Sequence, residues 1–244
     1  MALAGGMLDN GEGWKGYAWT SCEGADADGN ESSIMPEDFS EAVAGEAVCA
    51  MGQVITSVDS DGNRDYKGNA ILGWNLAQGE PEGTDAGTDI PASATVTPSG
   101  DGLLIKAAFN LVAVNSLGEF PSTGLRVQVQ GPNGGTDEND RWCANITKDD
   151  MDASDEGIKI PWNSFNTTCW DNKGNYYNKE PLEALMLQAS EKAPGIVVNF
   201  HMCLVDAREY TGTDSDSATD SDSAADSDSA TDSDTDSSSD TTTP

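Results

Sequence analysis

Histidine, basic side chains and long apolar runs are scarce in this sequence of 244 residues. His201 is the single histidine, which excludes metal sites built from two or more histidines. It lies inside the apolar segment 197–202, so we interpret it as a strand residue rather than a catalytic base. No apolar run approaches the length of about 18 residues that a membrane-spanning helix needs, so no membrane span is expected.

Basic residues are outnumbered by acidic ones, with 12 Lys and Arg against 43 Asp and Glu. The resulting net charge of −31 repels phosphate backbones and anionic lipid, which argues against nucleic acid or a membrane surface as the partner. Residues 211–244 contain ten Asp and no Lys or Arg, and alanine is their only hydrophobic residue. Such a segment cannot offset its ordering entropy, so the sequence predicts a folded domain over 1–210 and a disordered acidic linker or stalk over 211–244.

The remainder of the chain has short apolar runs separated by turns rich in Gly, Asn, Asp and Pro. Only the segment 181–189 could form a helix, and its final residues also fit a strand. The pattern predicts an all-β fold, an antiparallel β-sandwich. The expected strands are 47–55, 69–75, 103–113, 125–130, 142–147, 158–160, 185–189 and 196–204.

The clearest alternation lies in the segment 125–130, where Leu and Val occupy one face. Arg126, Gln128 and Gln130 occupy the other face and present a guanidinium and two amides in a row. These planar donors and acceptors suit a hydroxyl-rich ligand. The alternative is a solvated outer face of the sheet.

Aromatic residues lie close to Asn, Gly or Asp at several positions, where they could stack on sugar rings. A sandwich of this size also needs aromatic residues in its core, and Trp162 is assigned there. The aromatic candidates for ligand contact are Trp74, Trp142, Tyr176 and Tyr177.

A set of motifs occurs in a fixed order between residues 11 and 206. They are GYAWT (16–20), IMP (34–36), VCAMG (48–52), GWNLAQ (73–78), LRVQ (125–128), RWC (141–143), IPWNSF (160–165), CWDN (169–172) and NFHMC (199–203). This order resembles a galactose-binding-like jelly-roll module of secreted or surface proteins from myxobacteria and related bacteria. The resemblance implies a jelly-roll sandwich that binds plant or microbial polysaccharide, beside Asp/Ser/Thr linkers.

The same resemblance implies a cysteine pairing. Five widely spaced cysteines with no CxxC pair already suggest disulfides and an oxidising compartment, secreted or at the cell surface. By the resemblance, Cys49 pairs with Cys203 and Cys143 pairs with Cys169. Cys22 is then the odd thiol.

Similar sandwiches often carry a structural calcium ion away from the sugar site, so calcium is the one metal that the resemblance raises. The best local candidate is the segment 59–63, DSDGN. A calcium-binding loop that began at Asp59 would need Gly at its sixth position and Glu at its twelfth, but these positions are Arg64 and Ala70. We therefore favour a solvated hairpin turn there and assign no metal ligands.

The leading hypothesis is non-catalytic polysaccharide binding on one sheet face, with the acidic linker tethering a further domain beyond this sequence. A structural or adhesive surface protein is the alternative, in which Cys22 could crosslink chains. A glycoside hydrolase ranks lower, because no catalytic motif stands out. It would need a pair of carboxylates in a cleft, with Glu119 or Glu183 as candidates.

Overall fold

The computed structural model describes residues 4–43, 45–78, 94–115, 118–121, 124–193 and 195–212. Chain contacts separate residues 1–213 from residues 214–244. The acidic segment predicted to be disordered lies outside the described residues, except for its first two positions. Its disorder and its role as a linker therefore stay predictions.

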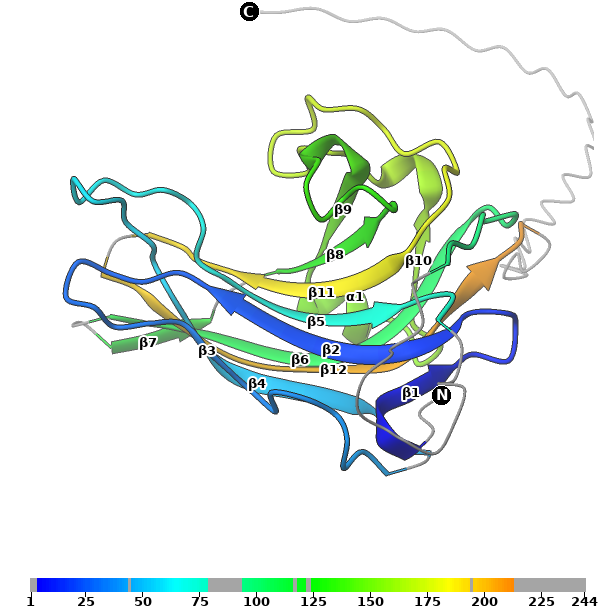
Figure 1. The fold of residues 1–244 in the computed structure, drawn as a ribbon, viewed down its shortest axis with the longest axis horizontal. Helices are drawn as coiled ribbons and strands as arrows, with labels where there is room; N and C mark the ends of the chain where they lie inside the picture. The colour runs from blue at the N-terminus through cyan, green and yellow to red at the C-terminus, as the bar shows by residue number, and fades with distance from the viewer. Residues whose placement is uncertain are drawn as a thin grey trace, which may run out of the picture. The chain divides into compact units, whose positions relative to one another are not determined.

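Two antiparallel sheets form the two layers of the domain, as Figure 1 shows. The first sheet has the strand order β1 (Met7–Asp9), β2 (Lys15–Glu23), β5 (Asn69–Asn75), β11 (Ala184–Ser190), β8 (Leu125–Gln130) and β9 (Arg141–Ile146). The second has the order β10 (Ile158–Pro161), β6 (Gly102–Asn115), β12 (Val197–Tyr210), β4 (Val48–Ile55) and β3 (Ser33–Met35), and β7 (Gly118–Pro121) pairs with β6. The predicted antiparallel β-sandwich is confirmed, and the chain crosses repeatedly from one sheet to the other, as in a jelly roll.

The core lies between the two sheets and follows the alternation of each strand. On β8, Leu125, Val127 and Val129 are each at most 1% exposed, while the residues between them are half-buried on the outer face. Large apolar side chains from both sheets pack against them, including Leu72, Leu187 and Ile105. The outer face of the first sheet is thereby left available for other roles.

Within the part of the chain that the structure describes, helical structure is limited to short segments. One α-helix, α1 (Lys148–Asp152), begins after Thr147, whose hydroxyl accepts a hydrogen bond from the Asp150 backbone while the Asp150 carboxylate accepts from Thr147. Three 3-10 turns occur at Ala4–Gly6, Glu138–Asp140 and Trp162–Ser164. The segment considered for a helix, 181–189, instead contributes to β11, because its backbone pairs with β5 on one side and β8 on the other. No helix among the described residues is long and apolar enough to cross a membrane.

Both disulfides implied by the resemblance are present. Cys49 and Cys203 face each other directly on β4 and β12. Cys143 on β9 is joined to Cys169 in the loop that follows β10. Cys22 is a free, half-buried thiol on β2. The first disulfide joins neighbouring strands, whereas the second fixes a loop over the edge of the first sheet.

Candidate ligand-binding site

The outer face of the first sheet carries the polar row predicted from the segment 125–130. Arg126 lies opposite Gln188 of β11 on one side and Asn145 of β9 on the other. Gln128 and Gln130 follow at two-residue steps along β8 on the same face. The register therefore places one guanidinium among amide side chains from three neighbouring strands.

A cavity of about 540 Å³ opens around Arg126. Besides Arg126, its walls include Arg64, Tyr66, Trp170, Gln188 and Glu191. We call it the Arg126 cavity. A smaller hollow of about 240 Å³ shares Arg126, Gln188 and Glu191 with it and adds Lys192. The two hollows therefore adjoin each other.

Two exposed aromatic side chains border the Arg126 cavity. Tyr66 is 73% exposed and Trp170 is 65% exposed. Each has a guanidinium against its ring, Arg64 at 4.4 Å from the Tyr66 ring centroid and Arg126 at 5.5 Å from that of Trp170. Large exposed aromatic rings held beside a cavity are a common feature of binding surfaces.

The loop that carries Trp170 is fixed over β9 by two links. Trp170 follows Cys169, which is covalently bonded to Cys143. The carbonyl of Cys169 also accepts a hydrogen bond of 2.9 Å from the Asn145 side chain. Since Asn145 lies opposite Arg126, these links place the indole beside the guanidinium.

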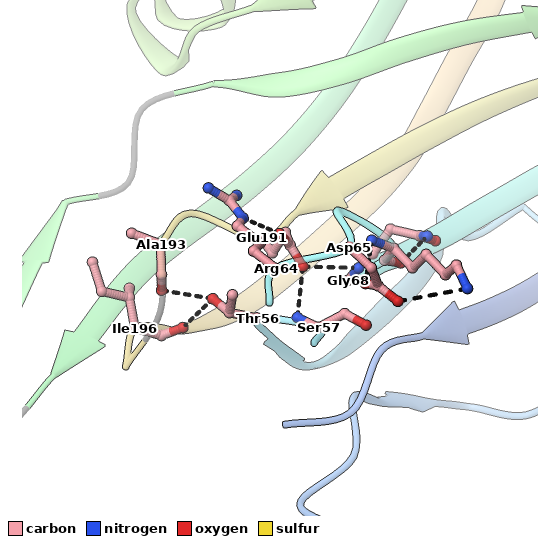
Figure 2. A network of polar contacts seen from close by, with 10 residues as sticks. Thr56, Ser57, Arg64, Asp65, Gly68, Glu191, Ala193 and Ile196 are labelled. Atoms are coloured by element: carbon pink, nitrogen blue, oxygen red, sulfur yellow. Dashed lines mark hydrogen bonds and ion pairs between the residues drawn. The ribbon is translucent and has the colours of Figure 1, made fainter. Parts of the chain in front are cut away.

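Glu191 fixes the opposite wall through the network shown in Figure 2. Its buried carboxylate accepts hydrogen bonds from the backbone N–H groups of Ser57, at 2.7 Å, and Gly68, at 2.9 Å. It also forms an ion pair with Arg64 Nε. Gly68 is needed here, because a Cβ at this position would collide with Glu191 and with the backbone of β4. Arg64, held by Glu191, stacks on Tyr66 and so fixes the surroundings of that ring.

Arg126 is held less completely than Arg64. Its Nη1 donates to Gln188 Oε1 at 3.4 Å, while its buried Nε has no hydrogen-bond partner among the described residues. The buried hydroxyl of Ser190, also in the cavity wall, likewise has none there. Burial lowers the pKa of Arg126 from its usual value, although a guanidinium remains charged at neutral pH. The cavity thus contains polar groups whose hydrogen-bonding capacity is not used within the described part of the chain.

Three of the aromatic candidates lie in the core, which corrects the sequence-based prediction. Trp74, Trp142 and Tyr177 are 0%, 5% and 3% exposed. Trp74 and Trp142 occupy inward positions of β5 and β9, and Tyr177 packs against Trp142 with ring centroids 5.0 Å apart. Burial and the nearby carboxylates of Glu180 and Glu209 raise the pKa of Tyr177 well above its usual range. None of these three rings offers a face to a ligand.

The other predicted residues lie on the surface but outside the cavity wall. Tyr176 is 55% exposed, and it is not among the residues that line the Arg126 cavity. Gln128 is half-buried with its amide nitrogen 3.7 Å from the sulfur of Met186. Gln130 lies at the far end of β8 from Arg126. Of the predicted ligand-binding set, Arg126 alone lines the cavity.

Sequence reasoning missed Tyr66, Trp170 and Gln188 as site residues. A further aromatic ring, Trp19 on β2, lies flat against Gly73 of β5, where there is no room for a Cβ. Its Nε1 donates to Asn75 Oδ1 at 3.0 Å. Trp19 is half-buried on the same outer face and extends the aromatic surface along the sheet.

The segment 59–63 forms a turn, as the sequence favoured. The Asp59 carboxylate accepts hydrogen bonds of 2.9 Å from the backbone N–H groups of Asp61 and Asn63, and Gly62 has a φ of 80°. Among the described residues, the one group of three potential metal ligands within 4.8 Å is Cys49, His201 and Cys203, whose two cysteines form a disulfide. A structural calcium ion stays a prediction, without assigned ligands.

Comparison with protein-family models and with characterised proteins finds no match. The resemblance to galactose-binding-like modules therefore rests on its motifs alone.

Proposed function

We propose that this protein binds polysaccharide without cleaving it, and that the Arg126 cavity is the binding site. The observation that carries the proposal is the pair of exposed rings, Tyr66 and Trp170, beside a cavity with guanidinium, amide and hydroxyl groups in its walls. The apolar C–H faces of a sugar ring can stack on the two aromatic side chains. Its hydroxyls can then pair with Arg126, Gln188 and Ser190, whose groups donate and accept in fixed directions.

The architecture of the site supports recognition of a polymer rather than an enclosed small molecule. Trp19 lies on the same sheet face as Arg126 and Gln128, so a chain of sugars could extend from the cavity along the sheet. Each ring adds a modest contact, and several contacts in a row raise the overall affinity. The proposal includes secretion, since disulfides persist in oxidising compartments. It also includes a tethering role for residues 211–244.

Hydrolysis is disfavoured by the composition of the cavity. A glycosidase needs two carboxylates about 5–10 Å apart, one of them free to donate or accept a proton. Glu191 is the one carboxylate among the described residues that line the cavity, and it is already paired with Arg64 and two backbone N–H groups. The site therefore has the features of a binding surface.

Depletion binding to a panel of insoluble polysaccharides tests the proposal, with the wild type, Tyr66→Ala, Trp170→Ala and Tyr176→Ala compared side by side. Loss of either cavity ring should weaken binding about tenfold or more, because aromatic anchors dominate such interfaces. Tyr176→Ala is the matched control, since it removes an exposed aromatic ring outside the cavity wall. Its affinity should equal that of the wild type.

The outcomes separate the three functions. Retention that depends on Tyr66 and Trp170 supports the proposal. Release of soluble sugar from the polymers would instead show an active site. No retention on any polysaccharide would overturn the proposal in favour of a structural surface protein.

A further inference from the structure

Three of the 12 basic side chains of this acidic chain lie around the proposed binding site. Arg64, Arg126 and Lys192 line the Arg126 cavity and the adjoining hollow, with Glu191 as the one acidic residue among their described lining residues. The chain as a whole has 12 Lys and Arg and 43 Asp and Glu. A surface patch with more cations than carboxylates is therefore a departure from the composition of the whole protein.

The charge of Arg126 is not balanced by a carboxylate among the described residues. Glu191 is engaged by Arg64, Ser57 and Gly68. Arg126 has instead one long hydrogen bond to a neutral amide, that of Gln188, and a stacking contact with Trp170. A half-buried guanidinium without an anionic partner is costly, and an anion that enters the cavity removes that cost.

We propose, building on the proposed function, that the ligand is an anionic polysaccharide whose charged substituent pairs with Arg126 while its sugar ring stacks on Trp170. A uronic-acid carboxylate matches the planar guanidinium and can accept two parallel hydrogen bonds from its terminal nitrogens. The unpartnered Ser190 hydroxyl offers a further donor in the same wall. A sulfate ester on a sugar supplies the same charge from a second source.

The overall charge of −31 does not prevent this pairing. At physiological ionic strength, exposed charges are screened beyond about 8 Å, whereas partly buried groups are screened much less. The local surroundings of Arg126 therefore decide which ligand is preferred, and the distant carboxylates mainly slow the approach of an anionic polymer.

The test compares polymers that differ only in charge, by affinity electrophoresis of the full chain. Polygalacturonate and alginate are each paired with their carboxyl-reduced, neutral forms, and dextran sulfate is paired with dextran. The wild type should bind an acidic member about tenfold or more tightly than its neutral partner, the size of a hydrogen-bonded charge pair. This comparison needs no variant.

Variants then assign the preference to Arg126. In Arg126→Gln the ratio of acidic to neutral binding should fall close to one, and Arg126→Lys should restore part of it. Arg208→Gln removes the same charge from an exposed position on β12 and should leave the ratio unchanged. Thermal unfolding of each variant checks that the domain is folded.

The results distinguish this inference from the proposed function. Preference for a uronate or for dextran sulfate supports the inference and identifies the anionic group. Equal retention of acidic and neutral polymers, or retention of neutral polymers alone, overturns it and leaves polysaccharide binding in place. If the ratio of acidic to neutral binding is unchanged in Arg126→Gln, the inference is also overturned. Absence of binding to any polysaccharide, charged or neutral, overturns the proposed function and this inference together.

Discussion

Glu191→Gln tests whether the buried carboxylate organises the wall of the site. The substitution keeps the shape of the side chain but removes its charge, so two charge-assisted hydrogen bonds from Ser57 and Gly68 become neutral ones. Each of these changes costs about 1 kcal/mol. Arg64 loses its ionic partner, and because its side chain is 23% exposed, that loss adds only about 1 kcal/mol.

The free energy of unfolding should therefore fall by about 3 kcal/mol in Glu191→Gln, measured by urea denaturation followed by circular dichroism. For a domain of this size the melting temperature should fall by about 6–12 °C. The slope of the urea transition should not change, since the surface exposed on unfolding is the same. Glu183→Gln is the control, because this half-buried glutamate lies outside the cavity, and its effect should stay within about 0.5 kcal/mol.

A double-mutant cycle with Arg64→Gln separates the ion pair from the backbone hydrogen bonds. Arg64→Gln alone removes the ion pair and leaves Ser57 and Gly68 bonded to the carboxylate, so it should cost about 1 kcal/mol. The two substitutions together should cost less than the sum of the single costs. A Glu191→Gln domain as stable as the wild type would refute the assignment of a structural role to this carboxylate.

Two further predictions concern the cysteines. Burial and the nearby Glu31 carboxylate raise the pKa of Cys22. Iodoacetamide at neutral pH should therefore alkylate Cys22 more slowly in the native chain than in the urea-unfolded chain, and Glu31→Gln should speed the native reaction. Equal alkylation rates in the native and unfolded chains would contradict this prediction. Replacing Cys143 and Cys169 together by alanine opens a loop with a sequence separation of 26 and should lower the free energy of unfolding by about 3–4 kcal/mol in urea denaturation. The same variant should bind polysaccharide more weakly because Trp170 loses its anchor, and unchanged affinity would show that the disulfide does not position the ring.

The strands that the sequence predicted are those in which local pattern and burial agree. The segment 125–130 alternates strictly, and β8 has the predicted bounds and the predicted inward face. β2 was missed because its sequence, KGYAWTSCE, has no such alternation. Its outward Trp19 is accommodated only by Gly73 on the neighbouring strand, and that match depends on a pairing between distant segments.

The aromatic residues likewise divide into those whose position the local sequence pattern indicates and those whose position depends on the pairing of distant segments. Trp142 could have been assigned to the core, since it lies at two-residue steps from the apolar Ala144 and Ile146 and shares their buried face. Tyr66 and Trp170 lie in loops, where no periodicity indicates which way a side chain points. Their common location at one cavity follows from the strand register and is not encoded in any local motif.

The two loops reach the cavity from different directions, and each has its own anchor. The Trp170 loop is tied to β9 by a disulfide, and the Tyr66 loop is tied to the end of β11 through Glu191. The register that places β9, β8, β11 and β5 side by side sets the separation of these anchors. Rings that are already held in place lose little conformational freedom when a ligand binds, so more of the stacking energy is retained as affinity. Removing either anchor should therefore weaken binding even though the aromatic ring itself is unchanged.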